Sequence, residues 1–312
     1  MAGARFTTTA HATAEATDKV PSLKGTTKGY NTPLTLATYA VSAKAATAAQ
    51  ARATSSTTTV ITPQNLADIG ILKGLLFGLT LSNGTDATND IDIAAGSCSD
   101  STGVRILVGS ALTKQLDATW AAGTNAGGRM SAAGIANTTY HVFAILKDSD
   151  GSVDYGFDVS ATAPTMPSGY TYFRRIGSII RASNAIVLFN QVGDEFLRLV
   201  PSQDAASASW TSTSTLVTCG VPVGVKVGAL VSVYVSLNTT LFGLVTSPDQ
   251  TDTAAASSNF NLAVTANSRI CIFSDAVRTD TSGQIRVNTD VSTAGGGFMH
   301  TRGWIDTRGR LA

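Results

Sequence analysis

Acidic side chains gather in two short stretches of the sequence where metal or acid–base chemistry could be sought. Asp86, Asp90 and Asp92 occupy one of them. A calcium-binding loop commonly spans twelve residues and is closed by a glutamate, and the spacing here fits neither feature. Aspartate favours turns because its carboxylate bonds to nearby backbone N–H groups. We therefore predict turn residues at this stretch, and also at Asp148 and Asp150, which mark a hairpin loop.

The histidines and cysteines are too dispersed to predict a metal site or a disulfide framework. They are His11, His141, His300, Cys98, Cys219 and Cys271. We expect His141 to pack within a strand and the cysteines to be buried free thiols. The sequence also lacks a Gly-x-Ser-x-Gly elbow and a phosphate-binding Gly-rich loop. We predict no catalytic residue, no metal and no cofactor, although two distant acids of a glycosidase could be hidden in such a chain.

Three arginines flank a predicted strand near the middle of the chain. Arg174, Arg175 and Arg181 could bind an acidic sugar. Surface charge is a weak indicator of a site. We expect these arginines to face water at strand ends or to pair with Asp154 and Asp158.

The C-terminal segment combines Trp304 with three arginines, Arg302, Arg308 and Arg310, which together could stack on and charge-pair with a saccharide. We favour a simpler interpretation, a closing strand with Trp304 in the core and the arginines facing water. Binding pockets pair apolar or aromatic surface with a few polar groups. The candidate receptor or glycan contacts on this basis are Trp210, Tyr234, Phe242 and Trp304.

The elements that position these residues are predicted to be strands. Only two glutamates occur, Glu15 and Glu195, and lysine is sparse beside Ser, Thr, Gly and Val. This composition favours strands and turns over solvent-facing helices beyond residue 70. The clearest hairpin runs from 140 to 159, with an apolar first arm and an alternating return arm. Further strands are predicted at 77–82, 175–181 and 185–191.

A second series of strands follows Pro201. The strongest alternation covers 228–237, and further strands are predicted at 269–273 and 284–291. Strands of this length, separated by polar loops such as 246–259, predict a β-sandwich or a jelly-roll-like domain. Its loops are expected to carry recognition.

Near the N-terminus one short phrase is written twice, at 32–39 and again at 62–69. Each copy begins with Thr-Pro, where Thr caps a helix and Pro takes its first position. Short helices are therefore predicted there. Residues 1–31 are rich in Ala and Thr and poor in aromatic residues, which favours flexibility because such a segment buries little apolar surface alone. The apolar residues sustain no heptad, so a long coiled coil is not predicted.

The run from Ala46 to Ala67 resembles the linker of tailed-bacteriophage tail fibre proteins. In that family an Ala-Thr-x-x-x-Ala-Arg-Ala lead and a Thr-rich spacer run into Thr-Pro-x-x-Leu, which corresponds here to 46–53, the spacer after it, and 62–66. The upstream segment 18–25 has the style of a virion-proximal segment. The likeness continues more loosely over 71–199 and in the closing segment 303–310.

The resemblance implies a structural virion protein, without enzymatic activity, and a homotrimer, since tail fibres are usually trimeric. Residues 1–70 would attach to tail, baseplate or collar proteins, 71–199 would form a β-rich stalk or shoulder, and 200–312 would bind a bacterial surface glycan or an outer-membrane receptor. The expected fold is mainly β, a flexible N-terminal segment with short helices followed by two antiparallel β domains. Trimerisation would let weak glycan contacts act together. Such a protein would be made in the host cytoplasm and reside in the virion, at the tail or collar.

Two alternatives remain open at this stage. A collar, neck or head-decoration fibre would share the linker and the β domains, and a glycan depolymerase built on a trimeric fibre would share the architecture. The formal net charge of +1 gives no basic face for a nucleic acid. We expect no signal peptide, because the N-terminus lacks an apolar core, and no run of about twenty apolar residues predicts a membrane span.

Overall fold

The computed structural model describes residues 20–22, 29–31, 72–265 and 270–310, with side chains described for 72–265 and 273–310. The chain forms two compact units, Met1–Ile71 and Leu72–Ala312. This division falls one residue from the predicted boundary after residue 70. The two Thr-Pro phrases and their expected helices lie outside the described residues.

The described part of the first unit is a small antiparallel ladder. Strand β1 (Val20–Ser22) pairs with β2 (Gly29–Asn31), with Val20 opposite Asn31 and Ser22 opposite Gly29. The sequence predicted no regular structure before residue 32. That expectation is wrong for these six residues, because backbone pairing satisfies their N–H and C=O groups without a large apolar face.

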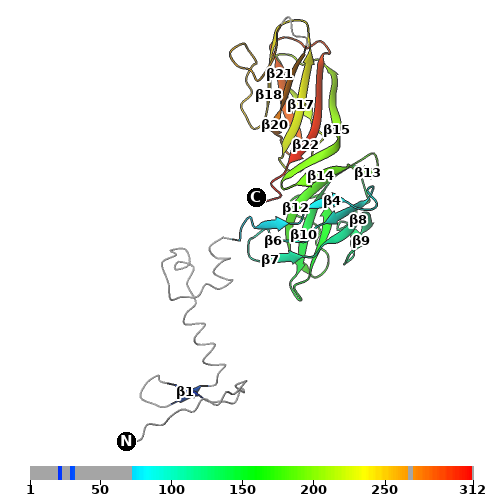
Figure 1. Cartoon of the computed structure of the whole chain (residues 1–312), viewed down its shortest axis with the longest axis vertical. Coiled ribbons are helices and arrows are strands. Elements are labelled where there is room, and N and C mark those ends of the chain that lie inside the picture. The colour runs from blue at the N-terminus through cyan, green and yellow to red at the C-terminus, as the bar shows by residue number, and fades with distance from the viewer. Residues whose placement is uncertain (1–19, 23–28, 32–71, 266–269, 311–312) are drawn as a thin grey trace. The chain divides into compact units, whose positions relative to one another are not determined.

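The largest sheet of the second unit has eight strands, in the order β13-β12-β10-β11-β9-β8-β5-β4 (Figure 1). Neighbouring strands are antiparallel except at β9, which runs parallel to both β8 and β11. The strands are β4 (Leu81–Asn83), β5 (Asp90–Ile93), β8 (Leu112–Thr119), β9 (Ala126–Arg129), β10 (Thr139–Lys147), β11 (Val153–Asp158), β12 (Tyr170–Ala182) and β13 (Ala185–Ile186).

The predicted hairpin at 140–159 is confirmed as β10 and β11, paired from Leu146 opposite Val153 to His141 opposite Asp158. Strand β10 reads as a continuous apolar run because both of its faces are covered. Val142 and Ala144 belong to the main core, whereas Phe143 and Ile145 belong to a smaller cluster with Met130. The turn prediction is confirmed at Asp86 and Asp150, whose carboxylates accept hydrogen bonds from the N–H groups two residues later, at 3.0 and 2.9 Å. It is wrong at Asp90 and Asp92, which lie in β5 and pair with β8.

A separate three-stranded sheet has the order β3-β6-β7. Its strands are β3 (Leu76–Gly78), β6 (Gly96–Ser99) and β7 (Ile106–Gly109). Cys98 and Leu107 face the core, while Phe77 and Val108 are 76% and 72% exposed. Phe77 and Val108 both lie opposite Ser97, so they share one outer face of the sheet.

The C-terminal part contains a five-stranded sheet of order β14-β15-β22-β17-β20 and a four-stranded sheet of order β16-β21-β18-β19. The predicted alternation in β17 is confirmed, since Val231, Val233 and Val235 are all 0% exposed. They join Ile285 and Val287 of β21 in one core. The strands are β14 (Phe189–Val192), β15 (Glu195–Ala208), β16 (Thr215–Thr218), β17 (Gly228–Ser236), β18 (Leu241–Thr246), β19 (Leu262–Val264), β20 (Ile270–Arg278), β21 (Gln284–Thr289) and β22 (Gly297–Ile305).

Strand β15 crosses the predicted boundary between residues 199 and 200. It pairs with β14 near its start and with β22 over most of its length (Figure 1). The main core is also continuous, since Phe157 of β11 and Val233 of β17 belong to the same buried cluster. The two β regions therefore meet along a shared strand and a shared core. The prediction of a mainly β chain with antiparallel sheets is confirmed, and the described residues contain no helix.

Candidate functional site

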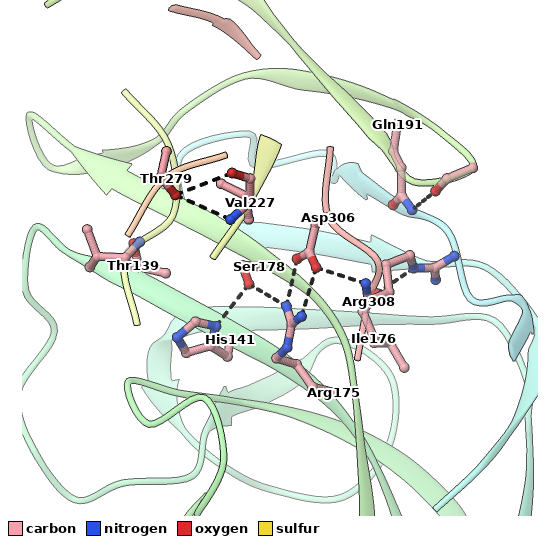
Figure 2. Close-up of polar contacts among 12 residues, drawn as sticks. Thr139, His141, Arg175, Ile176, Ser178, Gln191, Val227, Thr279, Asp306 and Arg308 are labelled. Carbon is pink, nitrogen blue, oxygen red and sulfur yellow. Dashed lines mark hydrogen bonds and ion pairs between the residues drawn. The ribbon is translucent and has the colours of Figure 1, made fainter. Parts of the chain in front are cut away.

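A cluster of buried polar groups lies where the C-terminal segment crosses β12 (Figure 2). Arg175 of β12 donates two hydrogen bonds to the carboxylate of Asp306, at 2.6 and 2.7 Å. Burial alone would raise the pKa of Asp306, but the hydrogen bonds and the charge of Arg175 outweigh it, so this pKa lies below its ordinary value. The pair fixes the end of β22 against the first sheet.

Arg308 is the second anchor of this segment. Its side chain is 3% exposed, and Nε donates to the carbonyl of Ile176 at 2.7 Å while Nη2 donates to the carbonyls of Gly78 and Leu79. The expectation that Arg308 faces water is therefore wrong. Three backbone carbonyls accept its donors, one within β12 and two at the end of β3 and just after it, which offsets the cost of burying the guanidinium.

The same junction holds a serine beside a histidine, the arrangement of a nucleophile and its base. Nδ1 of His141 lies 2.9 Å from Oγ of Ser178, which also accepts a hydrogen bond from Arg175 at 3.0 Å. Both Ser178 and His141 are 0% exposed. Burial, and then the charge of Arg175, lower the pKa of His141 to about 4. A nucleophile must reach its substrate, so this arrangement supports packing and not acyl transfer. The prediction that His141 is a packed strand residue is confirmed.

Neither expectation for the central arginines is confirmed. Arg174 and Arg181 are buried and Arg175 pairs with Asp306, so they do not face water, and the expected pairing with Asp154 and Asp158 is wrong. Asp154 forms a buried ion pair with Lys114 at 2.8 Å. Asp158 accepts hydrogen bonds from the backbone N–H groups of Ser160 and Thr165, each at 2.8 Å. The partner of Asp154 is Lys114 of β8, in the same sheet. The carboxylate of Asp158 is occupied by the backbone of the loop that follows β11.

The four predicted aromatic contacts divide into two groups. Trp210 and Trp304 are 2% and 0% exposed, and Trp304 stacks on Phe196 with ring centroids 5.3 Å apart. Both indoles belong to the core and present no face to a saccharide, as the interpretation of a closing strand predicts for Trp304. Tyr234 and Phe242 are half-buried. They pack edge-on or tilted against Phe298 and Phe260, at 5.4 and 5.0 Å between centroids.

The thiol prediction is confirmed for two cysteines. Cys98 and Cys219 are buried and free, and burial raises the pKa of each to about 12. The side chain of Cys271 lies outside the described residues. Within the part of the chain that the structure describes, no three His, Cys, Asp or Glu side chains come together as a metal site would require.

A surface groove of about 410 Å³ opens between β18 and β20. One wall is the end of β18 with the loop that follows it, and the other is the second half of β20. Polar side chains dominate the rim, and one aromatic ring, Phe273, lines the wall. The polar residues are Thr246, Ser247, Gln250, Asn261, Asp275 and Arg278.

Hydrogen bonds and ion pairs fix the positions of polar side chains around the groove. The Asn261 amide receives the N–H of Val245 at 2.9 Å and donates to its carbonyl at 2.8 Å, so it acts as a short extension of the sheet. Nε of Arg278 pairs with Asp249 at 2.9 Å, and Lys226 pairs with the other carboxylate oxygen at 2.5 Å. The hydrogen bond and charge of Lys226 lower the pKa of Asp249. The rim therefore carries fixed charge of both signs.

Several groups on the rim remain available to a ligand. Asp275 uses Oδ1 to accept the neighbouring N–H of Ala276 at 2.7 Å, and its Oδ2 accepts no hydrogen bond from the described residues. Gln250 uses its carbonyl oxygen on the N–H of Ser247 at 3.0 Å, and its NH₂ makes no hydrogen bond to the described residues. The rim thus offers an acceptor and a donor beside the Phe273 ring, a combination that suits a hydroxylated ligand.

The sequence analysis predicted the loop on one side of this groove but not the strand residues on the other side. The loop 246–259 was identified as polar, but the predicted strand beside it ended at residue 273, whereas β20 continues to Arg278. Ser274 and Asp275 resemble a strand end, and the alternation that would reveal an edge strand is lost at Ala276. The pairing of β20 with β17, which runs unbroken from Arg278 to Ile270, is a long-range feature.

Comparisons with other proteins add no identification. No family model matches the chain, and neither the curated proteins nor the solved structures give a match. Among the described residues, no helix has the length and apolar character needed to span a membrane.

Proposed function

We propose that this protein is a structural fibre component of a tailed-phage virion that binds a host-surface glycan through the groove between β18 and β20. Residues 1–70 attach the fibre to the particle, and the C-terminal sheets form a β-sandwich that faces the host. Three chains assemble, so that weak contacts with repeated glycan units act together. The fibre binds without turnover.

The observation that carries this proposal is the composition of the groove. Saccharides offer alternating hydroxyl donors and acceptors with apolar ring faces between them. Asp275, the Gln250 NH₂ and Arg278 supply the polar partners, and Phe273 supplies the apolar wall. A shallow groove on an edge strand also admits a long chain, which a closed pocket does not. The linker phrase at 46–67 and the β-rich architecture support the virion setting.

Binding of the full-length protein to an array of bacterial surface polysaccharides tests the proposal. We expect the D275A variant to bind the recognised glycan at least tenfold more weakly. The matched control is D117A, which removes an exposed aspartate from β8. Equal loss in both variants, or no loss in either, contradicts recognition by the groove.

Two further measurements separate the proposal from its alternatives. The full chain should compete with phage adsorption, and antibody against it should label the tail fibres in electron micrographs. Labelling at the neck or head instead would indicate a collar or decoration fibre. Release of oligosaccharides from the recognised glycan would indicate a depolymerase and would contradict binding without turnover.

A further inference from the structure

A second cavity, of about 280 Å³, lies beside the C-terminal segment. It shares no lining residue with the groove between β18 and β20. Its walls come from the loops after β6 and β11, from β12, from the segment before β17, and from the turn after β22. The lining residues that matter here are Ser101, Thr162, Phe173, Arg174, Val225 and Gly309.

Arg174 is the buried charge of this cavity. The residue is 5% exposed, and its Nε and Nη2 atoms are buried without a hydrogen-bond partner among the described residues. Nε and Nη2 form one edge of the guanidinium and present two parallel N–H groups. That edge is the geometry with which arginine binds a carboxylate or phosphate through two hydrogen bonds. A Cβ atom at Gly309 would lie 3.7 Å from Nε, an ordinary van der Waals distance, so Nε lies close to the turn after β22 that lines the cavity.

No protein carboxylate is free to take this edge. Asp100 is the carboxylate whose charge acts on Arg174, and its two oxygens accept hydrogen bonds from the backbone N–H groups of Thr102, Val104 and Arg105 and from the Thr102 hydroxyl. Burial keeps the Cys98 thiol neutral, because it raises the pKa of that thiol to about 12. The Asp100 carboxylate is therefore occupied by other donors, and the Cys98 thiol carries no negative charge.

Three arginines near Arg174 have partners within the protein. Arg175 pairs with Asp306, Arg310 pairs with Asp194, and Arg308 is bound by three backbone carbonyls. Burying an unpaired charge is costly unless a partner of opposite sign is supplied. The protein supplies none to Arg174 among its described residues.

We infer that this cavity binds an oxyanion, a carboxylate or a phosphate group, through the guanidinium of Arg174, the buried charge among its lining residues. Ser101 and Thr162 stand at the cavity and offer hydroxyls to the remaining oxygens. Phe173 and Val225 supply apolar wall, and the volume accommodates a group about the size of a single sugar. The ligand is thus a small acidic molecule or the acidic unit of a larger one, such as a uronic acid.

Calorimetric titration of the full chain at constant ionic strength tests the inference, with inorganic phosphate and glucuronate as the two arms and glucose as the neutral control. We expect saturable binding in at least one anion arm and none with glucose. Binding in the glucuronate arm alone identifies a carboxylate ligand, and binding in the phosphate arm alone identifies a phosphate ligand. The R174Q variant should bind at least tenfold more weakly, while R302Q, which removes an exposed arginine of β22, should bind as the unmodified protein does.

A second variant protects the test against misfolding of R174Q. Ala161 lines the same cavity on a loop, and A161L fills the space without touching the charge of Arg174. It should also abolish anion binding. Absence of anion binding by the unmodified chain, or binding unchanged in A161L, overturns the inference. Neither result bears on the glycan groove, whose variants are on β20.

Discussion

Arg175 and Asp306, 131 positions apart in sequence, form a two-bond ion pair whose side chains are only 11% and 2% exposed. The pair joins the eight-stranded sheet to the segment that leaves the five-stranded sheet. This ion pair links the two regions, which also share a hydrophobic core. The two β regions of the second unit should therefore unfold together, since separating them would break this pair and expose the shared core to water.

We predict that D306N destabilises the second unit by about 3–5 kcal/mol, the usual cost of leaving a buried charge without its partner. Urea unfolding at neutral pH measures the change in the free energy of unfolding. The control is D148N, which breaks an ion pair with Arg105 whose side chains are 50% and 45% exposed. That change should cost less than about 1 kcal/mol. Similar losses in the two variants would show that the buried pair has no special weight.

A second prediction concerns pH. The pKa of folded His141 is about 4, against an ordinary value near 6.5. Between these values the unfolded chain binds a proton that the folded chain does not, so stability falls as the pH drops from about 6.5 toward 4. The full loss is about 3 kcal/mol. The charged groups that influence His141 are Arg175, Asp306 and Asp158.

Urea unfolding at several pH values from 7 to 4.5 measures this loss. The H141N variant keeps an acceptor near the position of Nδ1 and removes the titration, so its stability should vary much less over the window. Asp306 acts at lower pH, because its depressed pKa places its contribution above about 3.8 and loses it below. An H141N profile parallel to that of the unmodified protein would assign the pH dependence to other groups.

Local patterns in the sequence were sufficient to predict about half of the strands of the second unit, and the stretch from β5 to β9 was missed. Alternation identified β17, and an apolar run followed by Asp-rich turn residues identified the β10–β11 hairpin. The loop after β12 was also predicted, and Ser183 and Asn184 take positive φ values of 50° and 64° there, as a tight hairpin turn requires. The sequence did not predict the continuity of β15, because Pro201 and Asp204 resemble a linker until β22 is known to pair with them.

The sites were harder to predict than the strands, since they depend on pairing between distant segments. Arg174 and Arg175 are adjacent in sequence, and only the fold shows that Arg175 reaches Asp306 while Arg174 has no partner among the described residues. Aromatic residue type alone could not separate Trp304, which is fully buried, from Phe273, which lines the groove. Both differences follow from the face of the strand on which each residue lies.

A third prediction separates packing from recognition among the aromatic residues. W304A should destabilise the second unit by about 3–5 kcal/mol, because it leaves a large cavity beside Phe196. Y234A removes a half-buried ring and should cost about 1 kcal/mol. Urea unfolding gives both values. A small effect of W304A would mean that the neighbouring strands collapse into the vacated space.

The last prediction concerns assembly. Light scattering on the full-length protein should give the mass of three chains of 32.0 kDa each. Phe77 and Val108 expose apolar side chains on one face of the three-stranded sheet, and such a face favours contact with another chain because burial removes it from water. Lysine at both positions should lower the mass, whereas T171K, an exposed change on β12, should leave it unchanged. A single-chain mass for the unmodified protein at micromolar concentration would contradict the trimer. An unchanged trimer in the double variant would place the contact elsewhere, since two buried lysines per chain cannot be desolvated without a large cost.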